Sequence, residues 1–187
     1  MKLNTIKDIT DFIFVGKKME ELTHYDLLII NADWCEEKLS KDLKIMLEKN
    51  IIDDNTVFII CESHGNTDRS SARILVDFLK REEITNKVII DDKYISNPEI
   101  LKNIDKLVDI NKYNKILRVA KDFVARRWYM NAIRHNFPIE KCDFYGLADS
   151  RNISKDDWHK SEIGINQVMK EFINIGQLTI ESELSID

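Results

Sequence analysis

Short runs of apolar residues alternate along the chain with longer segments in which apolar side chains recur every three or four positions. The apolar runs have the length of strands. They cover residues 27–30, 57–61, 87–90, 115–120 and, more weakly, 142–145. The runs are continuous rather than alternating, which is typical of strands covered on both faces and therefore of a parallel sheet. The pattern predicts a doubly wound α/β domain with about five parallel strands.

The segments between the runs predict helices, because their apolar positions share one helical face. Residues 1–22 indicate one or two helices before the first strand. The apolar stripe over residues 165–173 predicts a C-terminal helix. Ser154 followed by Asp157 resembles its capping box, and Gly176 is where we expect the helix to end.

Composition narrows the class of protein. The chain has 187 residues, of which 43% are hydrophobic and 33% charged, so it can bury a core and is not a disordered chain. Its length fits one domain over residues 1–187. A net charge of −5 offers no basic surface for nucleic acid, and no apolar run reaches the length of a membrane span. Three scattered cysteines suit a reducing compartment, so we expect a cytoplasmic protein.

The predicted fold determines where a ligand would bind. In doubly wound sheets, ligands lie beyond the carboxyl ends of the strands, where the strand order reverses. The residues that follow the predicted strands are therefore the candidates for binding a small molecule. They are Asn31, Ser63, His64, Gly65, Asn66, Asp91, Asn97, Glu99, Lys121 and Arg126.

The turn after the second predicted strand has two interpretations. Its backbone amides, with Ser63 and Asn66, could hold an anion at the start of the next helix. Alternatively it is an ordinary loop in which Asn66 or Thr67 caps that helix. His64 is a candidate general base or phosphate ligand, or an exposed loop histidine without a role. Cys61 and His64 have no second pair to complete a zinc site, so we expect no metal.

Arg126 and Arg127 follow Asp122, which we expect to cap a helix. Cations in the first turn of a helix oppose its dipole unless an anion compensates them. We therefore expect Arg126 to point into the ligand cleft and to contact an anion, or else an acid such as Asp91 or Glu99. Arg127 should point elsewhere, because it lies about 100° around the helix.

Catalysis is a separate hypothesis. Asp33, His64 and Asp91 are the candidates for acid–base chemistry, since each follows a predicted strand. They form no recognisable catalytic spacing, and the sequence leaves open whether the protein is an enzyme.

The order of these segments resembles the YdcF-like family, which includes the SanA and ElyC envelope proteins. The resemblance covers residues 25–176 and depends on order and spacing more than on identities. The residues that stand at the positions of the family's motifs are Asp26, Ser63-His64-Gly65, Ser70-Ser71-Ala72, Asp91, Tyr94, Ser96, Asn97, Glu99, Phe123, Arg126, Trp158 and Glu171. The chain departs from the family pattern where residues 31–33 lack glycine, where Ser71 replaces a glutamate and where Phe123 replaces a histidine. Tyr94 and Ser96 also replace a serine and an asparagine of the pattern.

The resemblance implies a three-layer Rossmann-like domain that binds a nucleotide-like ligand, S-adenosylmethionine being the usual suggestion for the family. We expect the strand order 3-2-1-4-5. The leading hypothesis is a domain that binds a small anionic, nucleotide-like metabolite at the ends of its strands. The alternatives are a hydrolase or transferase acting on a phosphorylated or adenylated small molecule, and an interaction module without a ligand.

Overall fold

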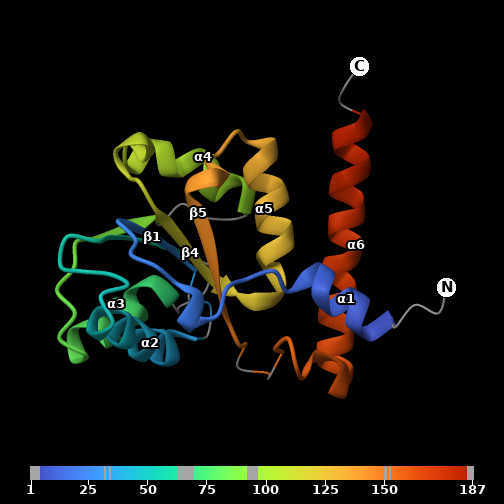
Figure 1. The fold of residues 1–187 in the computed structure, drawn as a ribbon, viewed down its shortest axis with the longest axis horizontal. Coiled ribbons are helices and arrows are strands. Elements are labelled where there is room, and N and C mark those ends of the chain that lie inside the picture. Colours follow the sequence, from blue (N-terminus) through green and yellow to red (C-terminus); the bar gives the residue numbers. More distant parts are fainter. Residues whose placement is uncertain are drawn as a thin grey trace.

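The computed structural model describes residues 5–31, 33, 35–62, 70–91, 97–149, 151 and 153–184. Its centre is a five-stranded sheet, all parallel, in the order β3-β2-β1-β4-β5 (Figure 1). The strands are β1 (Leu27–Ile30), β2 (Val57–Cys61), β3 (Val88–Asp91), β4 (Ile116–Lys121) and β5 (Cys142–Leu147). The predicted fold class and strand order are confirmed. The order reverses between β1 and β4, which is where ligands bind in such sheets.

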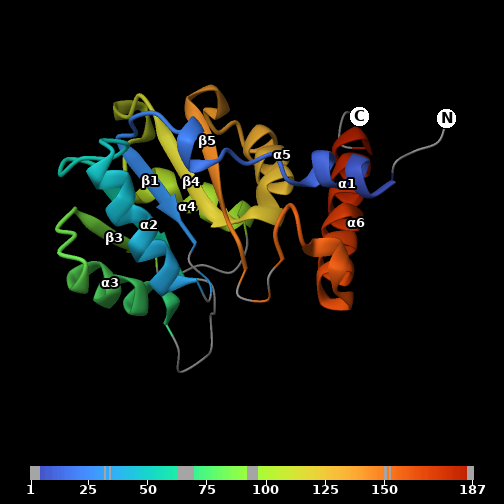
Figure 2. The same cartoon turned by 60° about the horizontal axis from the view of Figure 1, so that its bottom comes forward.

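Helices cover both faces of the sheet, giving the three layers seen in Figures 1 and 2. The helices are α1 (Thr5–Ile13), α2 (Glu36–Glu48), α3 (Ser71–Arg81), α4 (Asn97–Leu107), α5 (Ala125–Arg134) and α6 (Glu162–Leu184). Short 3₁₀ helices cover Met19–Glu21, Ile110–Lys112, Asp122–Val124, Ile139–Lys141 and Trp158–Lys160. None of the described helices is both long and apolar enough to cross a membrane.

The alternation of side chains along each strand builds two cores, because successive side chains in a strand point to opposite faces. On β1, Leu28 and Ile30 pack with the apolar stripes of α2 and α3. Leu27 and Ile29 pack on the other face, against α4 and α5, where Trp128 is wholly buried.

A third, smaller core joins α1 and α6 to the rest of the molecule. Ile13, Phe123, Trp158, Val168 and Ile175 meet there. Figure 1 shows α6 at the side of the sheet beyond α5, with α1 crossing it. The sheet therefore carries two helices that belong to neither of its covering layers.

The predicted bounds of the last helix are wrong at both ends. Ser154 donates to the Asp157 carboxylate over 2.9 Å, but within a turn that precedes the helix, which begins at Glu162. Gly176 does not end the helix, which continues to Leu184. A glycine ends a helix by adopting a positive φ, and none of the glycines in the described ranges has one.

Asp122, directly after β4, is packed against glycine. A Cβ on Gly146 would overlap the Asp122 carboxyl group and lie 2.8 Å from its Cβ, so only glycine fits beside it. Burial raises the pKa of Asp122 to about 6, with Asp156 adding to the rise and Lys155 opposing it. Because the folded state raises this pKa, the folded protein loses stability as the pH rises from 3.8, the ordinary pKa of an aspartate, through about 6.

Asp122→Asn is therefore expected to unfold less readily than the wild type above pH 6, by about 1–3 kcal/mol, because the amide carries no charge to bury. The gain should disappear near pH 3, where the folded and unfolded wild-type chains are both largely protonated at this position. Urea unfolding at a series of pH values measures both. Asp54→Asn, at an exposed position, is the control, and an equal gain there would contradict the assignment.

Candidate functional site

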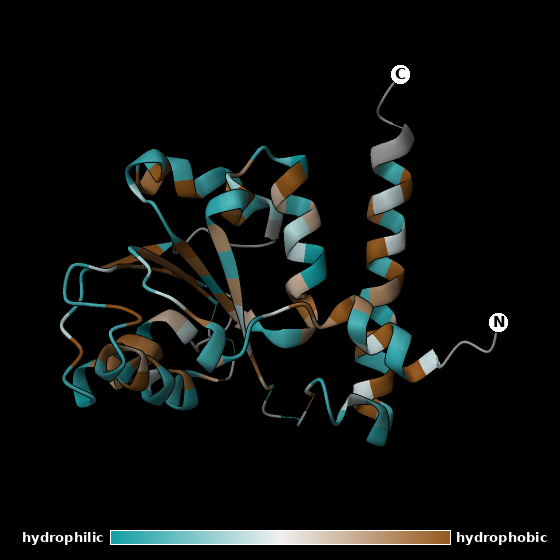
Figure 3. Cartoon of the chain, in the orientation of Figure 1, coloured by the Kyte–Doolittle hydropathy of each residue, from teal (hydrophilic) through white to brown (hydrophobic). Residues whose placement is uncertain are grey.

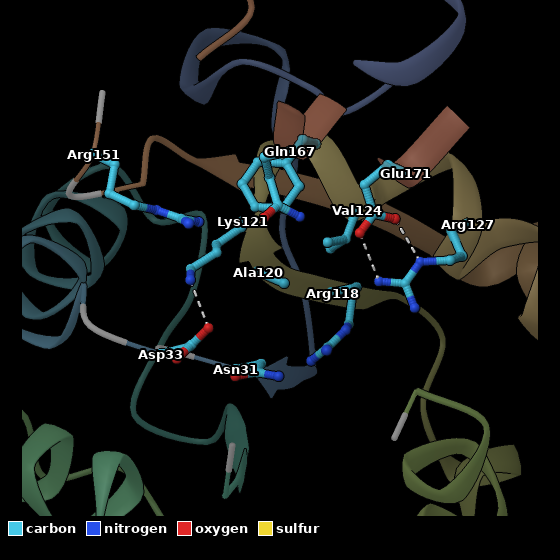
Figure 4. A pocket seen from close by; sticks show the side chains of 11 residues that line it. Asn31, Asp33, Arg118, Ala120, Lys121, Val124, Arg127, Arg151, Gln167 and Glu171 are labelled. Carbon is cyan, nitrogen blue, oxygen red and sulfur yellow. Dashed lines mark hydrogen bonds and ion pairs between the residues drawn. The ribbon is translucent and has the colours of Figure 1, made fainter. Parts of the chain in front are cut away.

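A cavity of about 250 Å³ opens at the carboxyl ends of β1 and β4, where the strand order reverses. Figure 4 shows the side chains that line it around a common space. They come from β1 and its end, from β4 and the residues after it, from α5, from the segment after β5 and from α6. The lining residues are Asn31, Asp33, Arg118, Ala120, Lys121, Phe123, Val124, Arg127, Arg151, Gln167 and Glu171.

The floor of the cavity is formed by β1 and β4. The Asn31 backbone amide donates to the carbonyl oxygen of Val119 over 2.8 Å, which fixes the chain where it leaves β1. Arg118 is fully buried, and its Nη1 donates to the Ile29 carbonyl oxygen over 3.1 Å. Within the described part of the chain, the buried Oδ1 of Asn31 accepts no hydrogen bond. A polar atom left this way is able to accept a hydrogen bond from a ligand.

One wall is an ion-pair network around Asp149. Lys121 Nζ lies 2.6 Å from an Asp33 oxygen and 3.2 Å from an Asp149 oxygen. Arg151 donates two hydrogen bonds to the same Asp149 carboxylate, from Nε over 2.8 Å and from Nη2 over 2.6 Å. Burial alone would raise the pKa of Asp149, but hydrogen bonds from Arg151 and the charge of Lys121 outweigh it and lower the pKa to about 2.

The opposite wall joins α5 to α6. Arg127, in the first turn of α5, donates from Nε over 2.6 Å and from Nη2 over 3.1 Å to the two oxygens of Glu171. Only 3% of Glu171 is exposed, so this carboxylate needs the guanidinium. The pair also compensates for the unfavourable position of a cation at the start of a helix, because the negative charge of Glu171 lies beside the positive end of the α5 dipole.

Asn31, Asp33 and Lys121, which the sequence put forward, line this cavity together. Two segments far apart in the sequence are brought to one edge because parallel strands all end on the same side. Their part in ligand binding stays a prediction.

The predicted direction of Arg126 is wrong. Its Nε donates to the Phe12 carbonyl oxygen over 2.9 Å, and its guanidinium carbon lies 5.0 Å from the centre of the Phe12 ring. It therefore faces α1 rather than the cavity, and within the described ranges no ion pair joins it to an acid. The adjacent Arg127 is the residue that lines the cavity. The expected cap is also wrong, because Asp122 begins a 3₁₀ helix and α5 starts at Ala125, after Val124. The packing of α1 determines which arginine faces which side.

Asp91 and Glu99 do not belong to the cavity lining. Asp91 is buried at the end of β3, and β3 is separated from β1 by β2. Neighbouring strands lie about 4.8 Å apart, so Asp91 starts about 10 Å from the β1 end. Of the three catalytic candidates, Asp33 lines the cavity, Asp91 does not, and His64 lies outside the described residues.

Ser63, His64, Gly65 and Asn66 also lie outside the described residues, and Asn97 begins α4. The alternative that Asn66 or Thr67 caps the following helix is wrong. The cap of α3 is Ser70, whose Oγ accepts from the Arg73 amide over 3.2 Å. Glu62 supports this cap, since its carboxylate accepts from the Ser70 hydroxyl and from the Ser71 amide.

The three cysteines are buried and form no disulfide. Burial raises the pKa of Cys61 to about 12; Arg118 lowers it and Asp91 raises it further. At neutral pH the thiol therefore keeps its proton and is a poor nucleophile. The described residues contain no group of three or more histidine, cysteine, aspartate or glutamate side chains placed to hold a metal ion.

The sequence reasoning missed several residues of the cavity: Arg118, Arg127, Arg151, Gln167 and Glu171. One of them carries a signal. Arg118 interrupts the apolar run of a buried strand, and burying a guanidinium is costly unless other groups compensate it. Such a position marks either an ion pair or a site. The others belong to helices and loops, and only the tertiary structure shows that their side chains point toward the cavity.

Comparison with known proteins adds no relative: no family model, no curated protein and no solved structure matches the chain.

Asp149→Asn is expected to destabilise the protein by about 2 kcal/mol at neutral pH, because a carboxylate held at a low pKa stabilises the fold wherever it is charged. The loss should shrink below the ordinary pKa of 3.8 and vanish as pH falls through about 2, where the native carboxylate is also protonated. Unfolding curves of both proteins between pH 7 and pH 2 test this. A difference that is independent of pH would contradict the charge assignment.

Proposed function

We propose that this protein binds a small anionic metabolite of nucleotide-like type in the cavity at the ends of β1 and β4. The observation that carries the proposal is the gathering of four cationic side chains in one small cavity: Arg118, Lys121, Arg127 and Arg151. They come from β4, α5 and the segment after β5. The acids that pair with them are Asp33, Glu171 and Asp149, so the cations remain in the majority by one charge.

Arg127 and Arg151 keep N–H donors for a ligand after their ion pairs are made. A guanidinium has five N–H donors and an ammonium has three. Glu171 takes two donors of Arg127, and Asp149 takes two side-chain donors of Arg151. An incoming phosphate or carboxylate can therefore be bound without breaking the ion pairs that hold the walls. Arginine suits this role because its planar fork matches phosphate and carboxylate oxygens.

The size of the cavity limits the ligand. Its volume of about 250 Å³ is just below the range of typical ligand sites, roughly 300–1,000 Å³, and suits a metabolite no larger than a nucleotide. The choice of a nucleotide-like ligand, S-adenosylmethionine included, is supported by the place at the strand switch and by the resemblance to the YdcF-like family.

Binding is favoured over catalysis by the state of the acids. General acid–base catalysis needs a carboxyl group within reach of the substrate and able to exchange a proton. Asp33 lies 2.6 Å from Lys121, and Glu171 lies 2.6 Å from Arg127. Both carboxylates are therefore engaged in holding the cations in place.

The test is a thermal-shift and calorimetric screen with inorganic phosphate, AMP, ATP and S-adenosylmethionine as probes. A probe at 100 times its dissociation constant should add about 2.7 kcal/mol to the free energy of unfolding. Arg151→Ala should then weaken binding by about 1.5–3 kcal/mol, the range for a hydrogen bond to a charged group.

Arg134→Ala is a closely matched control. The two arginine side chains are 41% and 40% exposed, and each is paired with an acid, but Arg134 binds Glu181 far from the cavity. Arg126→Ala is a second control, since this side chain contacts Phe12. If no probe binds, or if the controls lose as much affinity as Arg151→Ala, the proposal fails.

A further inference from the structure

Helix α6 has a buried face and an exposed apolar face. Its inner face packs on the domain, where Val168, Glu171 and Ile175 are at most 3% exposed. Its outer face carries Ile173 and Ile180, which are 57% and 59% exposed. Figure 3 shows apolar segments recurring along α6 at the side of the molecule. The helix therefore presents apolar surface that its own chain does not cover.

A groove between α1 and α6 adjoins this outer face. It has a volume of about 530 Å³, and four of its six lining residues are apolar. These four are Ile9, Phe12, Met169 and Phe172. The rings of Phe12 and Phe172 meet edge to face, with centroids 5.6 Å apart, so the groove has an ordered aromatic wall.

The exposed apolar area matches what a stable interface needs. Six large side chains of the groove and the outer face are each 36–59% exposed: Phe12, Ile165, Met169, Phe172, Ile173 and Ile180. At roughly 200 Å² for a whole large side chain, they expose about 500–600 Å². A standard interface buries about 800 Å² per partner, and somewhat over half of it is apolar. This surface is also at the upper limit of what monomers usually expose.

The spacing along α6 identifies the shape of the partner. Met169, Ile173, Gly176 and Ile180 follow one another at intervals of four, three and four residues, which is the seam of a coiled coil. Gly176 lies within the helix, yet apart from its neighbours and the backbone of its own helix, a Cβ there would meet no atom of the described residues within 4 Å. The fold therefore does not require a glycine at this position, whereas close approach of a second helix would.

The seam is complementary to itself. If two α6 helices pack antiparallel about a two-fold axis between residues 174 and 175, Ile173 lies opposite Gly176 of the partner subunit. In the same arrangement Met169 lies opposite Ile180 of the partner subunit. Each large side chain then faces a small one or fills the groove that Met169 lines, and a two-fold interface requires this kind of self-complementarity.

We propose that the protein forms a two-fold homodimer through α6, with Ile180 of the partner subunit seated at the groove between α1 and α6. The charges near the seam weigh against a lipid surface as the occupant. Lys7 is outnumbered by Asp8 and Asp11 on α1, and Lys170 by the glutamates of α6. Anionic membranes attract basic surfaces and repel acidic ones.

The test is sedimentation and light scattering of the full chain over a wide range of concentration. The wild type should reach twice its mass of 22.0 kDa. Ile173→Glu and Ile180→Glu should each raise the dimer dissociation constant about 30-fold or more, as expected for a residue at the centre of an interface. Ile163→Glu is the matched control, because Ile163 is 57% exposed on the same helix but lies about 80–140° around it from the residues of the seam.

Gly176→Leu separates association from folding. Leucine is a better helix former than glycine, so the isolated chain should keep its circular dichroism spectrum and still unfold cooperatively on heating. The leucine side chain should nevertheless separate the two helices and abolish the dimer. A wild-type mass of 22.0 kDa at every concentration would overturn the proposal, whether or not the protein sediments with anionic vesicles. So would a dimer that Ile163→Glu weakens as much as Ile173→Glu, or that Gly176→Leu leaves intact.

Discussion

A charge removed from water needs a partner of opposite sign, and this constraint organises the edge of the sheet where β1 and β4 end. Asp149 and Glu171 are almost fully buried, and each is held by arginine. Arg127 joins the first turn of α5 to the middle of α6, and Lys121 joins the end of β4 to the segment after β5 through Asp149. The ion pairs determine the shape of the cavity, and the apolar cores of the sheet determine its place.

The sheet could be predicted from the sequence because its signal is local. A run such as Leu27–Ile30 shows its burial in its own composition, and the lengths of the intervening segments leave room for crossover helices. The order of the strands could be predicted as well, from the way doubly wound sheets are built. The bounds of α6 could not. A local turn at Ser154 and a glycine at position 176 both look like helix ends, whereas packing on α1 and α5 continues the helix.

The cavity could be predicted only in part, because contacts between distant segments determine which side chains line it. Arg126 contacts α1, which leaves Arg127 to line the cavity. Helix α1 lies more than a hundred residues earlier in the chain, so the local sequence does not show which arginine faces it. Glu171 is one acid among several on α6 until Arg127 is placed beside it. Arg118 is different, since a charged residue that interrupts the apolar run of a strand can be recognised from its immediate neighbours in the chain.

Helix α6 completes the cavity, and it follows all five strands in the chain. During synthesis the protein emerges from its N-terminus and can begin to fold before the last segment is made. Every strand of the sheet is thus available before Gln167 and Glu171 exist to close one wall of the cavity. In a newly made molecule, the strands of the sheet are therefore complete before the cavity is.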